Sequence, residues 1–89
     1  MSTPETALKT KVLKWLKSQD VWVYKTSDRY RSGIPDLLIL KEGRLYAIEL
    51  KSSVGKVSII QEFTLRMMKK HGALTGICRS LEEVQCILN

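Results

Sequence analysis

The chain has 89 residues, of which 44% are hydrophobic and 27% are charged. These values are typical of a globular protein and exclude a disordered, collagen-like or low-complexity chain. Fifteen Lys and Arg residues against nine Asp and Glu residues give a net charge of +6, which favours a polyanionic partner such as nucleic acid. We expect one domain, spanning residues 1–89.

The cysteines and the hydropathy indicate the compartment. Cys78 and Cys86 lack the spacing of a zinc site, so we interpret both as buried, reduced thiols. The N-terminal residues MSTPETALK contain no apolar signal-peptide segment, and no apolar run approaches the roughly 20 residues that a membrane span needs. We therefore expect a cytoplasmic protein without a membrane partner.

The first predicted element is a helix over residues 4–18, with Thr3 as its cap and Pro4 at its first position. Apolar residues recur at helical spacing: Leu8, Val12, Trp15 and Leu16. The lysines that fall on the opposite side are expected in solvent: Lys9, Lys14 and Lys17. Glu5 lies three residues before Leu8 and extends the apolar stripe, so its carboxylate should point toward the edge of the core.

Three strands should follow this helix. VWVYKT, residues 21–26, is β-branched and aromatic, and a polar, basic loop over residues 27–33 comes after it. PDLLIL, residues 35–40, and RLYAIELK, residues 44–51, predict two strands joined by a hairpin turn at Glu42 and Gly43.

The C-terminal part predicts a helix, a strand and a helix. The helix runs from Ser58 to Lys70, ends before Gly72 and has a broad apolar surface. LTGICR, residues 74–79, predicts a strand, and Ser80 with Glu83 predicts a capping box for a last helix through Ile87. The order α-β-β-β-α-β-α indicates an α/β fold.

The hairpin turn brings two acids together. A two-residue turn at Glu42 and Gly43 places Leu38 opposite Ala47 and Asp36 opposite Glu49. Opposed Cβ atoms are roughly 5 Å apart, where like charges are destabilising unless a positive charge lies between them. Lys51 lies on the same face as Glu49, so we predict a divalent cation site with a lysine beside it.

The alternative is that Asp36 and Lys51 flank solvated strand ends and that Glu49 forms a surface ion pair with Lys51 or Lys41. The opposed acids, the lysine on their face and the inward Glu5 favour the cation site. Carboxylate oxygens are the ligands that Mg²⁺ prefers, and such an ion keeps open positions for phosphate oxygens.

These residues carry a family resemblance. Pro35-Asp36, followed after twelve residues by Glu49-Leu50-Lys51, resembles the PD-(D/E)xK nuclease signature. With Gly33 before the PD pair and Gln61 on the next helix, the chain most resembles the virus-type replication-repair nuclease (VRR-Nuc) branch over nearly its whole length from Glu5. Archaeal-type Holliday junction resolvases are relatives of this branch.

The resemblance implies a restriction-endonuclease-like domain with a mixed central sheet. It implies that Asp36, Glu49 and the backbone carbonyl of Leu50 bind Mg²⁺ or Mn²⁺, with Glu5 serving the same metal site. Lys51 would orient or deprotonate the attacking water, or would remain protonated and stabilise the negative charge of the phosphate, and the sequence leaves both roles open. The products would be a 5′-phosphate and a 3′-hydroxyl.

Gln61 has two explanations. The resemblance gives it a catalytic role, whereas the spacing from Ser58 fits a capping box in which Gln61 bonds the start of its helix. The candidate DNA contacts, each also readable as an ordinary surface residue, surround the site: Lys25, Arg29, Tyr30, Arg31, Lys56 and Ser58.

The function that we predict is that of a metal-dependent, structure-selective DNA endonuclease that cuts four-way junctions as a homodimer through helical faces. Trp15 and Trp22 are interpreted as core or interface residues. The absence of further domains suggests a stand-alone phage enzyme in the host cytoplasm, and a recruiting helicase or replication partner stays open. The alternatives are a non-catalytic nucleic-acid-binding module, a flap nuclease and a restriction-type nuclease.

Overall fold

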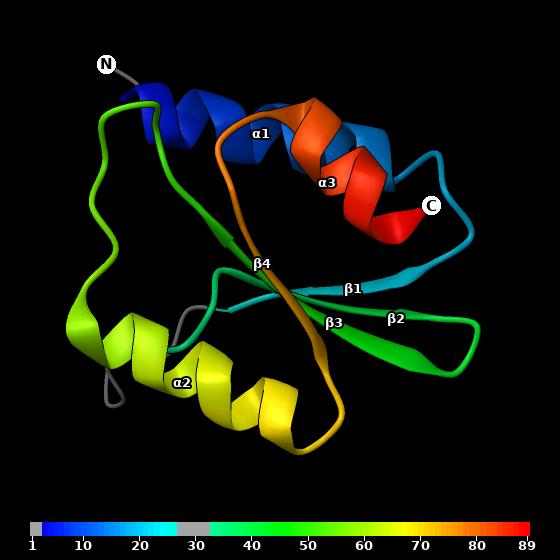
Figure 1. Cartoon of the computed structure of the whole chain (residues 1–89). Helices are drawn as coiled ribbons and strands as arrows, with labels where there is room; N and C mark the ends of the chain where they lie inside the picture. The colour runs from blue at the N-terminus through cyan, green and yellow to red at the C-terminus, as the bar shows by residue number, and fades with distance from the viewer. Residues whose placement is uncertain (1–2, 27–32) are drawn as a thin grey trace.

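The computed structural model describes residues 3–26 and 33–89. Within these ranges, three helices flank a four-stranded sheet in the predicted order α-β-β-β-α-β-α (Figure 1). The elements are α1 (Pro4–Leu16), β1 (Trp22–Lys25), β2 (Leu37–Lys41), β3 (Arg44–Leu50), α2 (Ile59–Lys70), β4 (Leu74–Cys78) and α3 (Leu81–Leu88). The predicted α/β fold class is confirmed.

The sheet is mixed, as expected. Its strand order is β1-β2-β3-β4, in which β1, β2 and β3 are antiparallel neighbours and β4 runs parallel to β3. A parallel neighbour requires a crossover connection, and α2 provides it. In Figure 1, α1 and α3 lie on one side of the sheet and α2 lies on the other.

The hairpin between β2 and β3 has the predicted register. Leu38 is paired with Ala47 and Leu40 with Leu45. The turn residues Glu42 and Gly43 have φ values of 51° and 80°, the left-handed pair that a two-residue hairpin turn requires. This turn fixes which residues of the two strands face each other at their far end.

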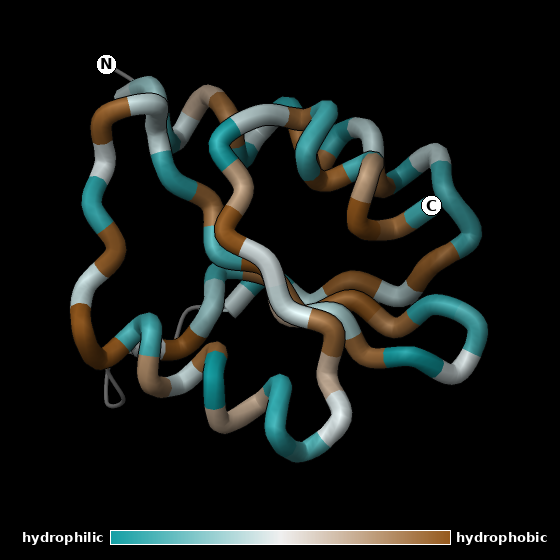
Figure 2. The backbone as a smooth tube through the Cα atoms, in the orientation of Figure 1, coloured by the Kyte–Doolittle hydropathy of each residue, from teal (hydrophilic) through white to brown (hydrophobic). Residues whose placement is uncertain are grey.

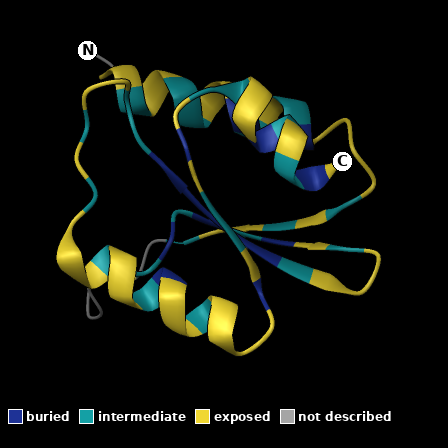
Figure 3. Cartoon of the chain, in the orientation of Figure 1, coloured by how far each residue is buried: buried dark blue, intermediate teal, exposed yellow. Residues whose placement is uncertain are grey.

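The core lies between the sheet and the pair of helices α1 and α3. Leu37 and Ile39 of β2 and Ile48 of β3 alternate onto this face, where they are fully buried. They pack in one cluster with residues from both helices and from β4: Val12, Leu16, Cys78, Val84 and Leu88. Figure 2 shows hydrophobic residues along the strands, and Figure 3 shows that the buried strand residues lie mainly in the two central strands β2 and β3.

Helix α2 covers the other face of the sheet and exposes most of its own surface (Figure 3). Leu65 is buried, whereas the side chains of Ile59 and Phe63 are 86% and 60% exposed. Ile60 and Met67 are exposed as well, so an apolar stripe faces solvent along the helix. The described residues therefore leave the broad apolar surface expected from the sequence largely uncovered.

The ends of two helices differ slightly from expectation. Helix α1 ends at Leu16, because the following residue Lys17 already acts as its C-cap. At the start of α3, Ser80 Oγ accepts the N–H of Glu83 at 3.2 Å, but the Glu83 carboxylate accepts the N–H of Arg79 rather than that of Ser80. The predicted capping box is therefore only half formed, with its second bond moved back by one residue.

The cysteines and tryptophans are only partly where we expected them. Cys78 is buried, and burial, followed by the nearby Glu83, raises the pKa of its thiol to about 11. Cys86 is exposed, so its interpretation as a buried thiol was wrong. Trp15 packs against the core, whereas Trp22 is exposed and stacks on Tyr24 with ring centroids 6.2 Å apart. In the described ranges, no helix combines the length and apolar character that crossing a membrane requires.

Candidate metal-dependent nuclease site

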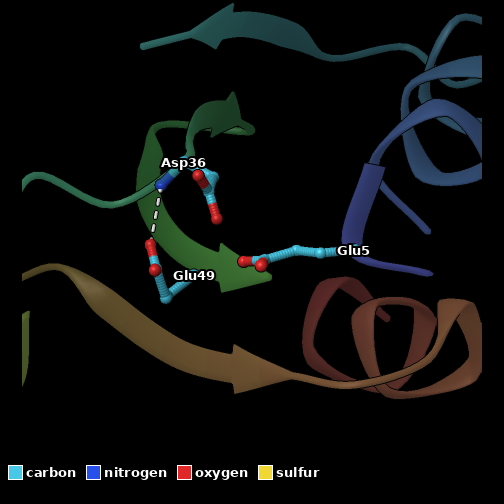
Figure 4. Close-up of side chains that lie close together, drawn as sticks. All are labelled: Glu5, Asp36 and Glu49. Carbon is cyan, nitrogen blue, oxygen red and sulfur yellow. Dashed lines mark hydrogen bonds between the residues drawn. The ribbon is translucent and has the colours of Figure 1, made fainter. Parts of the chain in front are cut away.

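Asp36, directly before β2, and Glu49 of β3 are joined across the open end of the hairpin. The Asp36 N–H donates to Glu49 Oε1 at 3.1 Å, drawn as the dashed line in Figure 4, and the Leu50 N–H donates to Asp36 Oδ2 at 2.8 Å. Each carboxylate therefore accepts a backbone N–H of the opposite strand, as a ladder carbonyl would. One oxygen of each acid is fixed, and the second oxygen is held only by side chains.

A third acid reaches the same place from helix α1. Thr3 caps this helix by accepting the N–H of Thr6 at 3.1 Å, which places Glu5 in the first turn. One oxygen from each of Glu5, Asp36 and Glu49 lies within 4.8 Å of the other two. Figure 4 shows Glu5 extending from α1 toward the two strand acids.

The donor set of this triad suits a hard divalent cation. Oxygen ligands lie about 2.0–2.6 Å from Mg²⁺ or Ca²⁺, so two ligands on opposite sides of the ion are about 4–5 Å apart. The 4.8 Å limit on the three carboxylate oxygens falls in this range. Three carboxylates so close together repel one another unless positive charge lies among them. The residues therefore fit a bound cation.

Glu49 is the buried member of the triad. It is 2% exposed, and its pKa is raised to about 7 by burial first and by the neighbouring charge of Asp36 second. Lys51 acts in the opposite direction and lowers it. A buried carboxylate with a raised pKa is a common feature of functional sites, because a stable core rarely keeps such a group without a use.

Lys51 lies within the acid cluster. Its Nζ is 3.5 Å from Glu49 Oε2 and 3.9 Å from Glu5 Oε1, and its side chain is 14% exposed. Glu49 therefore does pair with Lys51, as the alternative had it, but the pair is not a solvated surface pair, because Glu49 is buried and Lys51 nearly so. Lys41 is not a partner of Glu49, since its Nζ donates to the Leu88 carbonyl at the end of α3.

Gln61 forms the predicted cap and also contacts the acid cluster, while its catalytic role stays a prediction. Its Oε1 accepts the Ser58 N–H at 3.0 Å and its own N–H donates to Ser58 Oγ at 3.2 Å, which completes a capping box. Its Nε2 donates to Glu49 Oε2 at 2.6 Å. One side chain therefore caps the start of α2 and orients the buried acid.

Lys9 is a member of the cluster that the sequence reasoning missed. Its Nζ lies 3.2 Å from Asp36 Oδ1, and the two side chains are 27% and 21% exposed. We expected Lys9 in solvent, and this was wrong, because its long side chain reaches past the helix to the strand end. The signal was present in the spacing, since residues four apart share a helix face and Lys9 follows Glu5 by four. Lys14 and Lys17 are exposed as predicted.

Two further contacts position the backbone around the site. Arg79 Nη1 donates to the carbonyls of Ser52 and Gly55 at 2.6 and 2.7 Å and so clamps the turn that follows Lys51. Gly33 has φ 83°, and a Cβ there would lie 2.8 Å from the Ile60 carbonyl oxygen. The segment leading to Asp36 therefore touches the first turn of α2, and sequence reasoning singled out neither contact.

The candidate DNA contacts are only partly described. Lys25 and Lys56 are exposed, and Ser58 is exposed but engaged in the cap of α2. Arg29, Tyr30 and Arg31 lie outside the described residues. The role of all six in DNA binding stays a prediction.

Comparisons with known proteins identify the family of this fold. The VRR-NUC domain model matches residues 5–82. A solved structure named as a VRR-NUC domain is 26% identical, with a TM-score of 0.82 over 98% of this chain and 96% of the other. A second, named as a VRR-NUC domain protein, is 19% identical and supports the fold, with a TM-score of 0.82 over 99% of this chain and 87% of the other.

A comparison with curated proteins finds no match. The family model nevertheless covers most of the chain, including all three acids, Lys51 and Gln61. The chain therefore belongs to the VRR-NUC domain family and has a nuclease-type function.

Proposed function

We propose that the chain is a metal-dependent DNA endonuclease that hydrolyses phosphodiester bonds and prefers branched DNA. The observation that carries this proposal is the convergence of three carboxylate oxygens within 4.8 Å, with the Lys51 ammonium beside them. In a module that only bound DNA, three acids facing the phosphates would lower the affinity for DNA.

In this proposal Asp36, Glu49 and Glu5 hold Mg²⁺ or Mn²⁺, together with the backbone carbonyl of Leu50. The bound ion supplies polarisation of the scissile phosphate and a lowered pKa of a water ligand. The N–H groups of Asp36 and Leu50 keep the two strand carboxylates oriented before substrate arrives. Preorganisation of this kind removes the cost of arranging charged groups during the reaction.

Lys51 acts on the attacking water or on the phosphate, and Gln61 acts on Glu49. Lys51 lies next to the acids and either orients and deprotonates the attacking water or, as a cation, stabilises the charge that develops on the phosphate. Gln61 holds Glu49 Oε2, so that its carboxylate cannot rotate away. The products are a 5′-phosphate and a 3′-hydroxyl.

We further propose that two copies associate through the exposed apolar stripe of α2 and cut the two strands of a four-way junction. The stripe is supported as an interface by the exposure of Ile59, Ile60, Phe63 and Met67. Light scattering should give the mass of a dimer, and Phe63→Glu should give that of a monomer. Val54→Glu, which charges an equally apolar residue outside the helix, should leave the dimer intact.

The test of the activity is cleavage of end-labelled four-way junction, flap and linear duplex DNA with Mg²⁺, Mn²⁺ or EDTA. Wild type should cut the junction symmetrically in either metal and not in EDTA, and Asp36→Asn should lose cleavage while still binding DNA. Cleavage of flaps or duplex in preference to junctions would contradict the junction as the preferred substrate. Binding of DNA without cleavage under every condition would overturn the proposed nuclease activity.

A further inference from the structure

Each acid of the hairpin has one oxygen held by a backbone N–H and the other held by a side chain. Glu49 Oε1 accepts the Asp36 N–H, and its Oε2 accepts Gln61 Nε2. Asp36 Oδ2 accepts the Leu50 N–H, and its Oδ1 accepts Lys9 Nζ at 3.2 Å. Lys9 therefore donates to the second oxygen of Asp36 as Gln61 donates to the second oxygen of Glu49, but Lys9 carries a full positive charge.

Helix α1 presents Glu5 and Lys9 one turn apart on the same face. The same helix thus adds both an anion and a cation to the cluster. The Lys9 and Asp36 side chains are 27% and 21% exposed, so water screens their attraction less than it would at an open surface. The pairing is consistent with a fixed position for the Lys9 ammonium.

The formal charge of the cluster defines what Lys9 changes. Three ionised carboxylates and the ammonium groups of Lys9 and Lys51 leave a charge of −1, and a divalent cation brings it to +1. Without Lys9, the same cation would leave the site neutral. A positive site attracts a phosphodiester and stabilises the additional negative charge of its transition state.

We propose that Lys9 is a positioning residue of the nuclease site, which orients Asp36 through Oδ1, weakens the binding of the divalent cation and strengthens the attraction for DNA phosphate. The inference rests on the proposed function. Two cations near one carboxylate oxygen repel each other, so removal of the Lys9 ammonium should strengthen binding of the metal ion. The same removal takes a positive charge away from the DNA phosphate, so it should weaken binding of the DNA.

The test uses Lys9→Met, with Lys9→Arg to restore the charge and Lys11→Met as the matched control. Lys11 is exposed on the same helix, and its loss changes the net charge of the chain equally. Free Mn²⁺ is titrated by electron paramagnetic resonance, and the single-turnover cleavage rate is measured at saturating Mn²⁺. Lys9→Gln provides a second neutral variant should Lys9→Met fold poorly.

Lys9→Met should bind Mn²⁺ about 10-fold more tightly and yet cleave more slowly at saturating metal. Lys9→Arg should return both quantities toward wild type, and Lys11→Met should alter neither. A residue with only a structural role would lose metal affinity and rate together, so weaker Mn²⁺ binding by Lys9→Met would overturn the inference.

The proposed function is tested separately by Asp36→Asn in the same titration. Loss of Mn²⁺ binding in Asp36→Asn, with Lys9→Met indistinguishable from Lys11→Met, would overturn the role of Lys9 alone. A wild-type chain that binds no Mn²⁺ would overturn the metal site itself.

Discussion

Gln61 Nε2 lies 2.6 Å from Glu49 Oε2, while the same side chain closes the capping box with Ser58. The start of α2 and the orientation of the buried acid are thus determined by one amide group. This arrangement makes it possible to remove the cap alone or the cap and the site contact together.

Ser58→Ala and Gln61→Ala should separate these two roles. Ser58→Ala removes the hydroxyl acceptor of the cap and should lower the free energy of unfolding by about 1 kcal/mol without weakening metal binding. Gln61→Ala should lower stability by a similar amount and also weaken Mn²⁺ binding, because Glu49 loses its donor. Urea unfolding and Mn²⁺ titration check the pair, and equal Mn²⁺ affinities in the two variants would reduce Gln61 to a cap.

Glu49 should give the protein an unusual pH dependence of stability in EDTA. Its pKa rises from 4.5 to about 7 on folding, so the folded state binds this proton more tightly than the unfolded state. The stabilisation is complete below pH 4.5 and is lost as the pH rises through 7, by up to about 3 kcal/mol. Urea unfolding at several pH values should show the decline, and Glu49→Gln should remove this contribution. Stability that rises between pH 5 and 7 in both proteins would contradict the expectation.

Gly33 should be less tolerant of a side chain than Gly43, although both have positive φ. The two residues have φ values of 83° and 80°, but only at Gly33 would a Cβ meet another group, the Ile60 carbonyl at 2.8 Å. Gly43→Ala should cost about 1 kcal/mol for its backbone conformation alone. Gly33→Ala should cost more, because the segment before Asp36 and the first turn of α2 must separate. Thermal unfolding of the two variants provides the comparison, and equal losses would show that this contact is easily relieved.

Arg79 should hold the turn after Lys51 in place. Arg79→Ala removes the donor to the Ser52 and Gly55 carbonyls, so amide hydrogen exchange of residues 52–57 should accelerate. Cleavage should slow, because Lys51 adjoins this turn. Arg44→Ala is the control, since Arg44 is an exposed arginine at the hairpin end. Unchanged exchange in Arg79→Ala would show that the turn is stable without the clamp.

The opposition of Asp36 and Glu49 was accessible from sequence because it depends on short-range rules. A two-residue turn fixes the register of the hairpin, and the alternation of side chains then places the two acids on one face. This step needs no knowledge of how the helices pack on the sheet. The helical stripe pointed Glu5 only toward the edge of the core, and the family resemblance assigned it to the metal site.

Lys9 was missed because its position depends on that packing. Hydrophobic periodicity identifies the buried face of α1, but it does not say that the sheet ends beside the first turns of the helix. A lysine side chain near such an end is long enough to reach an acid at the end of a strand, even though the lysine lies on the polar face of its helix. The exposure of Cys86 and the clamp by Arg79 were inaccessible for the same reason, since both depend on the placement of α3 and β4.

Ile60 and Gln61 are neighbours in the chain but point to different sides of α2, about 100° apart around the helix. Ile60 lies in the exposed stripe and against Gly33, whereas Gln61 bonds Glu49. A partner that docks on the outer side and displaces this turn would therefore alter the site on the inner side. Such coupling is reciprocal, so the cation proposed for the site would change the affinity of the outer side by the same factor. The first turn of α2 would then make that cation an effector of whatever associates with this helix.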